Sequence, residues 1–272
     1  MISVLVRSHN DIEYIRKTIE MLLSQELDGE AMEIISCDDH STDGTREYLE
    51  SVGEVRKIEP PEGRYVPGKT LNYMVSQAKG EYIIFNNGDA IPQSKDYLLK
   101  LTAPLKDAEP DCVFAKQVAR ADALKVVERD YLSVFGEGKL ASQNKGFFSL
   151  VSSGFRKDEL IKHPFDETFQ YSEDSAWVNK RPVKIVYVIG AVVEHSHNYS
   201  LKAVKKRFFN EGIADTQMGK KPINLVHTCR RIVVDILRDW YYIIKCGAWR
   251  EFLYSPLYRL VQKISYYRGA NR

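Results

Sequence analysis

Residues 82–92 read Tyr-Ile-Ile-Phe-Asn-Asn-Gly-Asp-Ala-Ile-Pro, and this segment is the strongest indication of the fold class. Its β-branched and aromatic residues predict a buried parallel strand that stops at Asn87-Gly88-Asp89. Asp89 is then expected at the carboxyl end of the strand, which is where open α/β sheets bind ligands. A single aspartate after a strand is more often a turn former or a helix cap, so its role has to be judged from the rest of the chain.

The chain before this strand repeats one pattern of strand, polar loop and helix. The expected strands are 2–6, 33–37 and 55–58, and the expected helices are 12–24, 45–52 and 69–78. This alternation predicts an α/β fold with right-handed crossovers and a mainly parallel sheet that helices cover on both faces. The polar side chains that follow the strands should gather at one edge of that sheet: Ser8, Asn10, Asp38, Asp39, Asn87 and Asp89.

The composition excludes several classes of protein. With 272 residues, 44% hydrophobic and 28% charged, the chain is long enough for one large α/β domain and an appendage. Its four cysteines have no CxxC spacing, which indicates neither a disulfide framework nor a structural zinc site and fits a reducing cytosol. No signal peptide is expected, and no apolar stretch is long enough to span a bilayer. Residues 1–219 carry 28 basic and 34 acidic side chains, which argues against nucleic-acid binding.

The usual phosphate-binding glycine motifs are missing. A dinucleotide site would need GxGxxG after the first strand, and a P-loop would need GxxxxGK[ST]; neither is present. The alternative is a divalent cation held by Asp89, because a hard cation prefers oxygen ligands and can bridge phosphate oxygens.

Four motifs together resemble the family 2 glycosyltransferases with a GT-A fold. They are SVLVRSHN at 3–10, CDDHSTDGT at 37–45, GEYIIFNNGD at 80–89 and SED at 172–174. The resemblance covers roughly residues 1–215 and implies a GT-A catalytic domain there, which leaves residues 216–272 as a C-terminal helical extension. It also implies an enzyme that takes a sugar from a nucleotide-diphosphate donor with the help of Mn²⁺ or Mg²⁺.

The resemblance assigns the donor side to five residues. In the family the second acid of the Asp-Asp pair contacts the nucleobase, which corresponds to Asp39, and Ser8 and Asn10 lie at the same edge. The Asp-x-Asp motif that binds the metal and the diphosphate corresponds to Asn87 and Asp89.

Two departures from the family pattern affect this assignment. An amide, Asn87, replaces the first motif acid, which puts the affinity and identity of the metal in doubt. Arg7-Ser8 replaces the usual Pro-Thr after the first strand. Asp43 is interpreted as the Asx turn and cap of the following helix.

The acceptor side is expected between residues 146 and 177. Residues 146–156 resemble the strand and turn that precede a helix facing both substrates, and Glu173, Asp174 and Trp177 follow on that helix. The second acid of Glu-Asp is the family's catalytic base, so the resemblance assigns Asp174 to the acceptor hydroxyl. One base opposite a leaving diphosphate implies a single inverting displacement. For Glu173, a helix cap is an equally good interpretation.

A strand over 185–193 ends in two histidines at alternate positions, His195 and His197. Histidines at a strand end are usually surface residues. The resemblance implies that one of them contacts the metal or the diphosphate, and His195 is favoured because it lies nearer the strand.

The segments 198–200, 205–209 and 89–92 resemble bacterial rhamnosyltransferases within the family. This resemblance favours dTDP-rhamnose as the donor, with a UDP-sugar as the other choice. The acceptor would be a glycan or a lipid-linked glycan in cell-surface polysaccharide synthesis.

The C-terminal extension differs in charge from the rest of the chain, since residues 220–272 carry 11 basic and 3 acidic side chains. The first of its two expected helices should pack through Ile232, Ile236, Trp240 and Ile244, with Val233 and Leu237, and expose Asp235, Arg238 and Asp239. The extension could pack on the catalytic domain or form a homodimer. Alternatively, its cations and aromatics could lie on an anionic membrane, which would make the protein cytoplasmic and peripheral on the inner face of the cell membrane.

Two rival functions remain at this point. A nucleotidyltransferase would need a glycine-rich basic loop after the first strand, and residues 7–10 do not provide one. A non-catalytic glycan-binding or scaffold protein would be compatible with Asn87, but the intact Glu173-Asp174 pair argues against it.

Overall fold

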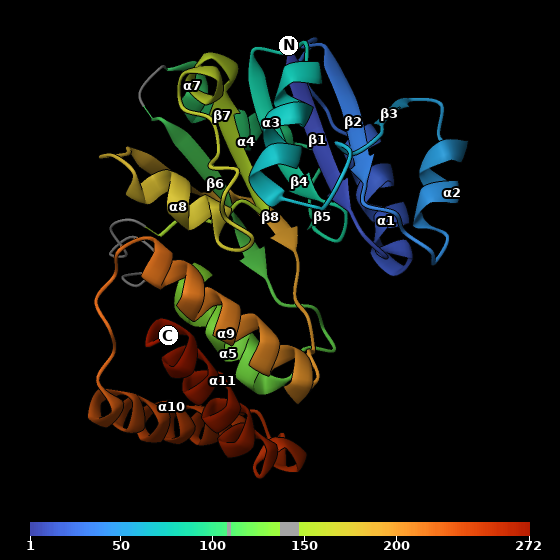
Figure 1. The fold of residues 1–272 in the computed structure, drawn as a ribbon. Coiled ribbons are helices and arrows are strands. Elements are labelled where there is room, and N and C mark those ends of the chain that lie inside the picture. The colour runs from blue at the N-terminus through green and yellow to red at the C-terminus, as the bar shows by residue number, and fades with distance from the viewer. Residues whose placement is uncertain (108–109, 137–146) are drawn as a thin grey trace. The chain divides into compact units, whose positions relative to one another are not determined.

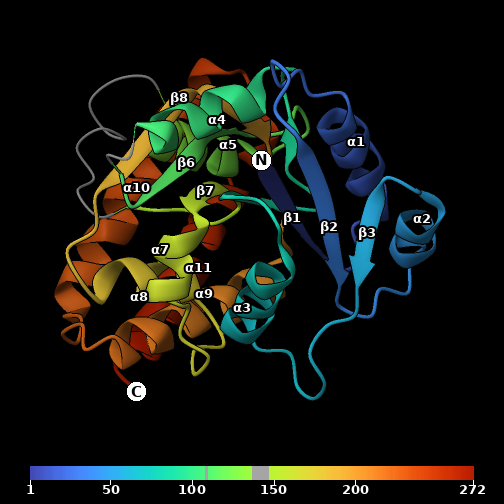
Figure 2. The ribbon, with the colours of Figure 1, turned by 90° about the horizontal axis from the view of Figure 1, so that it is seen from above.

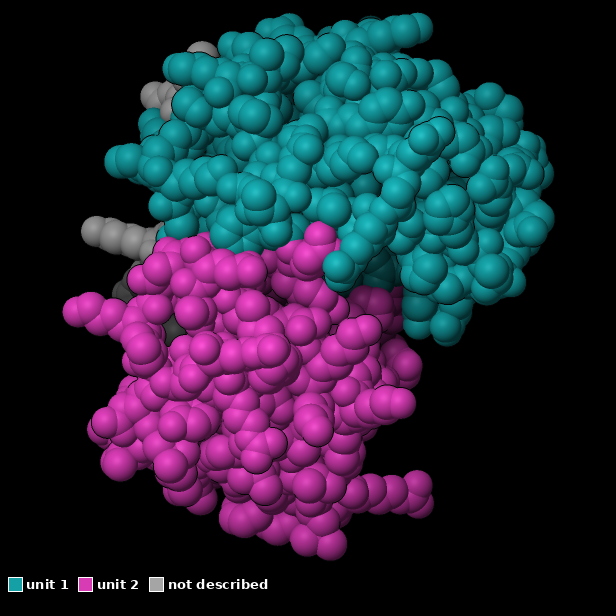
Figure 3. All heavy atoms as spheres, in the orientation of Figure 1, with its two compact units in different colours: residues 1–118, 137–169, 173–195 teal, residues 119–136, 170–172, 196–272 magenta. Residues whose placement is uncertain are grey.

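The computed structural model describes residues 1–107, 110–136 and 147–272. They form two compact units, coloured separately in Figure 3. The first contains residues 1–118, the described part of 137–169, and residues 173–195. The second contains residues 119–136, 170–172 and 196–272.

The first unit is built on a mixed sheet, which has eight strands within the described residues, in the order β3-β2-β1-β4-β7-β6-β8-β5. β2 pairs in parallel with β3 and β1, β1 with β4, and β6 with β8, whereas β7 runs antiparallel to β4 and β6, and β5 to β8. The strands are β1 Ile2–Ser8, β2 Met32–Asp38, β3 Val55–Ile58, β4 Tyr82–Asn87, β5 Ile91–Pro92, β6 Cys112–Val118, β7 Ser152–Arg156 and β8 Ile185–Glu194.

The predicted α/β class and mainly parallel sheet are confirmed. Because β7 is antiparallel to both of its neighbours, β4, β6 and β8 still run in the same direction as β1 and β2. The carboxyl ends of these five strands therefore lie along one edge of the sheet, and that edge receives the polar loops.

Helices cover both faces of this sheet. Figure 2 shows α1 and α4 on one face, and α3, α7 and α8 on the other. The helices of the unit are α1 Ile12–Leu23, α2 Thr45–Ser51, α3 Pro67–Gln77, α4 Tyr97–Lys106, α7 Lys157–Lys162 and α8 Glu173–Asn179. Buried aliphatic side chains of α1 and α4 pack on β1 and β4. On the other face the rings of Phe85, Phe155, Phe165 and Trp177 meet largely edge to face, a favourable geometry for aromatic pairs.

The second unit is helical (Figure 1). It contains α5 Lys125–Phe135, α9 Leu201–Gln217, α10 Leu225–Lys245, the 3-10 turn η1 Trp249–Glu251 and α11 Tyr254–Ala270. α9 packs closely along α11, and a Cβ at Gly212 would collide with the backbone of Tyr266. These contacts group α9 with the C-terminal helices, while the domain boundary after residue 215 stays a prediction. None of the described helices combines the length and the apolarity needed to cross a membrane.

The prediction for the packing face of α10 was correct in part, since Ile232 is buried, Ile236 and Trp240 are half-buried and Arg238 is exposed. It was wrong for the two acids and for three of the apolar residues. Asp235 and Asp239 are buried, although they were expected to face solvent. The predicted packing residues Val233, Leu237 and Ile244 are exposed instead. The physical reason is long-range ion pairing, because Arg259 of α11 binds Asp239 and Lys263 of α11 binds Asp235. These pairs turn the acidic side of α10 inward.

Candidate active site

The turn after β4 presents Asp89 at the carboxyl edge of the sheet. The backbone N–H of Ala90 donates to the carbonyl of Asn87 at 3.0 Å, and that of Gly88 donates to the carbonyl of Arg7 at 2.9 Å. A Cβ at Gly88 would lie only 2.9 Å from both Asp11 Oδ2 and Ile15 Cδ1, so glycine allows this turn to lie against α1. The turn thereby holds the carboxylate of Asp89 in a buried position.

His195 faces Asp89 at the end of β8. Its Nε2 lies 3.4 Å from Asp89 Oδ2, and both side chains are about nine-tenths buried. His195 Nδ1 donates to Gln117 Oε1 at 3.1 Å, and Gln117 Nε2 donates to Ser149 Oγ at 2.7 Å. With Nδ1 bonded to Gln117, His195 has its Nε2 on the side of the Asp89 carboxylate, where both groups could bind one cation.

The chemistry of this pair fits a divalent metal. Asp89 and His195 belong to a group of side chains that could hold an ion. A mixed carboxylate and imidazole set suits a transition-metal ion such as Mn²⁺ better than Mg²⁺, which prefers oxygen ligands. His197, the alternative ligand, belongs to the second compact unit, where its ring stacks on Tyr199 with centroids 4.8 Å apart. Its role in metal binding stays a prediction.

The loops after β1 and β2 are joined by side-chain hydrogen bonds. Ser8 Oγ donates to Asp38 Oδ1 at 2.9 Å, and the N–H of Ser41 donates to Asp38 Oδ2 at 2.9 Å. Asn10, which has a φ of 56°, accepts the N–H of Thr42 at 2.9 Å. Ser8, Asn10 and Asp38 therefore organise the loops.

Asp39, the predicted nucleobase contact, directly follows Asp38 in this loop. Its carboxylate is half-buried at the edge, and its N–H donates to the carbonyl of Ser8 at 2.9 Å. The Asx turn expected at Asp43 is present, since its Oδ1 accepts the N–H of Thr45 at 3.0 Å. The N-cap residue of α2 is Gly44, so the cap expected at Asp43 was misplaced by one residue. Asp43 Oδ2 also accepts the N–H of Ile12 at 3.0 Å, at the start of α1. A contact between Asp39 and a nucleotide stays a prediction.

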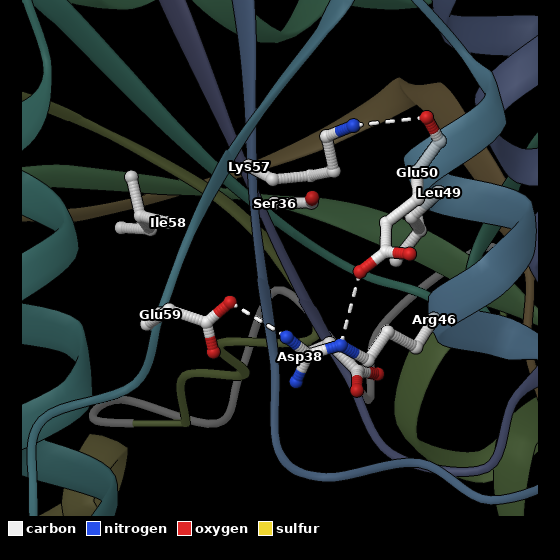
Figure 4. Close-up of a pocket in the computed structure, with 8 residues that line it drawn as sticks. All are labelled: Ser36, Asp38, Arg46, Leu49, Glu50, Lys57, Ile58 and Glu59. Atoms are coloured by element: carbon white, nitrogen blue, oxygen red, sulfur yellow. Dashed lines mark hydrogen bonds and ion pairs between the residues drawn. The ribbon is translucent and has the colours of Figure 1, made fainter.

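A small pocket opens beside Asp38, between β2, β3 and α2 (Figure 4). Charged side chains line it and pair with one another: Arg46 binds Glu59 at 2.7 Å and Glu50 at 3.1 Å. Lys57 Nζ donates to the carbonyl of Glu50 at 3.0 Å. The pocket thus places paired charges beside Asp38.

The Glu-Asp motif begins α8, and the two acids have different surroundings. Glu173 is buried, and its Oε1 accepts from Arg7 Nη1 at 3.1 Å. The same Arg7 nitrogen donates to Tyr65 Oη at 3.2 Å. Asp174 is half-buried, and its Oδ1 accepts the N–H of Ser175 at 2.7 Å.

These surroundings leave Asp174 basic enough to accept a proton. Burial, followed by the charge of Glu173, raises the pKa of Asp174 from 3.8 to about 6, while backbone donors and Arg7 act in the opposite direction. A carboxylate with a pKa near 6 is deprotonated at neutral pH and has an appreciable affinity for a proton, as a general base requires. The role of catalytic base itself stays a prediction.

Trp177 is part of α8 and packs this helix against β7. It is buried, its Nε1 donates to the carbonyl of His163 at 2.6 Å, and its ring meets that of Phe155 at 5.2 Å. Arg181 covers its ring at 4.5 Å. The expected direct contact of Trp177 with the acceptor stays a prediction, and the contacts described here are structural. Of the expected acceptor strand and turn, Gly146 lies outside the described residues.

The family model for glycosyl transferase family 2 matches residues 3–164, which is more than half of the chain. The chain belongs to this family. The model ends before α8 and β8, so Asp174 and His195 lie outside the matched segment. Membership of this family argues against the rival interpretation of the chain as a nucleotidyltransferase.

Two curated relatives match parts of the chain. The poly(ribitol-phosphate) β-N-acetylglucosaminyltransferase TarS of Staphylococcus aureus is 33% identical over 111 residues, which cover 39% of this chain and 18% of TarS. The O-antigen chain rhamnosyltransferase WbaN of Salmonella anatum is 26% identical over 196 residues, which cover 66% of this chain and 62% of WbaN. The chain thus spans less than a fifth of TarS and under two thirds of WbaN.

Solved structures confirm the GT-A fold over nearly the whole chain. The mannosyltransferase PcManGT of Pyrobaculum calidifontis, solved with GDP-Man and Mn²⁺, has a TM-score of 0.66 at 15% identity and covers 97% of this chain and 86% of its own. TarS 1–349 of S. aureus with UDP-GlcNAc has a TM-score of 0.60 at 16% identity and covers 98% and 89%. At these identities the likeness concerns the fold alone.

Three residues of the site were not identified from the sequence. Tyr65 and Gln117 carry no motif, and their contacts come from segments far apart in the chain. Arg7 was noted as a departure from the family pattern, but nothing local indicated that it would pair with Glu173, 166 residues away.

Proposed function

We propose that this protein is an inverting glycosyltransferase that moves a sugar from a nucleoside-diphosphate donor to a hydroxyl of a glycan or lipid-linked acceptor. The observation that carries the proposal is Asp174, a half-buried carboxylate with a raised pKa in the Glu-Asp motif of this family. Support also comes from Asp89 and His195, a buried pair with ligand atoms 3.4 Å apart at the same sheet edge.

In the proposed reaction Asp174 accepts the proton of the acceptor hydroxyl. The acceptor oxygen bonds to the anomeric carbon from one face while the bond to the diphosphate oxygen breaks on the other, so the configuration inverts. Asp89 and His195 would hold the divalent metal, and Asn87 lies at the same turn. When bound, the metal offsets the negative charge that develops on the departing diphosphate. Asp39 would contact the nucleobase, with Ser8 and Asn10 shaping the loops beside it.

The donor we propose is dTDP-rhamnose, with a UDP-sugar as the alternative. The rhamnosyltransferase WbaN supports the first choice and the N-acetylglucosaminyltransferase TarS the second. Both names also support a role in cell-surface polysaccharide synthesis. The proposed location is cytoplasmic, on the inner face of the cell membrane, and a homodimer remains the alternative use of the C-terminal helices.

Thermal unfolding with a panel of nucleotide sugars, with and without Mn²⁺ or Mg²⁺, tests the donor. A ligand that binds the folded state raises the melting temperature by mass action, so the true donor should stand out when the metal is present. The Asp89→Ala variant is the control and should lose the metal-dependent part of the shift. If no nucleotide sugar stabilises the wild type, the proposed function is wrong.

A glycan-binding protein that has retained the fold is the second candidate, and the amide at Asn87 favours it. The two functions differ in turnover. A non-catalytic protein would bind a glycan without releasing nucleoside diphosphate, even with the correct donor and metal. Release of nucleoside diphosphate that disappears in Asp174→Asn would exclude the binding function.

A further inference from the structure

The outward side of α10 is an exposed apolar stripe. Val226 is 76% exposed and Tyr241 is 70% exposed, and the positions between them that share their side are exposed as well. The stripe, here called the outer face of α10, consists of Leu225, Val226, Val233, Leu237, Tyr241 and Ile244. Spacings of three, four and seven residues place Val226, Val233, Leu237, Tyr241 and Ile244 along one side of the helix, and Leu225 adjoins them at its first turn. Trp249 and Leu253, just after the helix, extend the exposed apolar surface.

Buried ion pairs determine this orientation. Asp239 is fully buried and accepts from Arg259 Nε at 2.7 Å, and Lys263 Nζ lies 3.0 Å from Asp235 Oδ2. Turning the helix to bury its apolar stripe would break these pairs and leave charges uncompensated, which is strongly unfavourable. The helix therefore keeps its apolar side outward.

The charge on this side of α10 has one sign. Asp235 and Asp239 are the only acids in α10, and both are buried against α11. The exposed charged residues of the helix are all basic: Arg230, Arg231, Arg238 and Lys245. A depression of about 400 Å³ lies on the same side, between α10 and α5, and is lined by Arg129, Leu237, Arg238, Tyr241 and Tyr242. Apolar, aromatic and cationic groups thus occur together without exposed acids on the helix.

We propose that the outer face of α10 binds an anionic lipid surface. Its aliphatic side chains could insert at the boundary of the acyl chains, while its tyrosine and Trp249 would lie at the level of the headgroups. Its cations would pair with anionic headgroups. A second copy of the chain is a poorer partner. A symmetric α10–α10 contact would bring arginines and lysines together, with no exposed acid on the helix to pair with them. This inference concerns the second unit and does not depend on the proposed transfer reaction.

Sedimentation of the full chain with vesicles tests the inference. The protein should bind phosphatidylcholine vesicles that contain phosphatidylglycerol, bind pure phosphatidylcholine weakly, and dissociate as salt rises. Val233→Glu with Leu237→Glu should abolish binding, because both changes put charge into the apolar boundary. Arg230→Gln with Lys245→Gln should weaken it by about fivefold per removed cation. Trp249 fluorescence should shift to the blue on binding, and this shift should be lost in Trp249→Phe.

The matched control for Leu237→Glu alone is Ile161→Glu, which places the same charge at a 67% exposed apolar residue of α7, outside the outer face of α10. It should bind vesicles like the wild type. Circular dichroism identifies any variant that fails to fold. If the glutamate variants fail to fold, the Arg230→Gln and Lys245→Gln variant still tests the inference. The inference is wrong if the wild type binds neither vesicle, or if Ile161→Glu weakens binding as much as the α10 variants. It is equally wrong if the wild type is a lipid-independent dimer that Leu237→Glu dissociates. None of these readouts uses a sugar donor, so their failure leaves the transfer reaction untouched.

Discussion

The pH dependence of sugar transfer should report the environment of Asp174. Its pKa of about 6, against an ordinary 3.8, results mainly from burial and then from the charge of Glu173. At about pH 5 such a group is roughly 9% deprotonated, whereas an ordinary aspartate would be about 94% deprotonated. Because the base acts only when deprotonated, kcat/KM should fall about tenfold from its plateau at pH 5 and continue to fall about tenfold for each further pH unit.

Glu173→Gln tests the cause of this shift. The change removes a negative charge that raises the pKa of Asp174, and it leaves Arg7, which lowers it. The acid limb should therefore move to lower pH, and the variant should gain activity relative to its own plateau at about pH 5. Donor-saturated initial rates of nucleoside diphosphate release, measured across the pH range with a soluble acceptor, provide the profile.

Asp174→Asn is the reference for both experiments. The amide keeps the shape of the side chain but accepts no proton, so transfer should fall by about 10² to 10⁴-fold with little change in donor affinity. An acid limb that stays at the same pH in Glu173→Gln would show that the Glu173 charge does not raise the pKa of Asp174. An active Asp174→Asn that retains the wild-type limb would show that another group is the base, and Glu173 would then be the next candidate.

Three further predictions concern other residues. Arg7→Gln should move the acid limb to higher pH, because the Arg7 charge lowers the pKa of Asp174; a shift in the opposite direction in the same rate assay would contradict this. Asn87→Asp should tighten Mn²⁺ binding in calorimetry by restoring a negative charge beside Asp89, and unchanged affinity would place Asn87 outside the metal ligands. Arg259→Met should lower the free energy of unfolding by about 1.5–3 kcal/mol in urea denaturation, because it removes one of the two guanidinium groups, those of Arg129 and Arg259, that pair with buried Asp239. Unchanged stability in Arg259→Met would refute the explanation.

Local pattern alone determined much of the first unit. The strand over 55–58 and the helix starts at Ile12 and Thr45 have the predicted positions, because alternating and helical periodicities and turn residues act between neighbours in the chain. The motif order also led to the correct family, and parallel strand direction predicted that the polar loops would share one edge. The Asx turn at Asp43 followed from short-range hydrogen bonding for the same reason.

Tertiary structure alone decided the features that depend on distant partners. Arg7 meets Glu173 and Tyr65, and His195 meets Asp89 and Gln117, through contacts between residues 58 to 166 positions apart that no local spacing records. The packing face of α10 is the clearest example of a feature that the sequence pattern left open. Its sequence has apolar residues on more than one side, so periodicity could not choose the packing face. Arg259 and Lys263 on another helix made that choice, because burying a carboxylate is favourable only where a cation meets it.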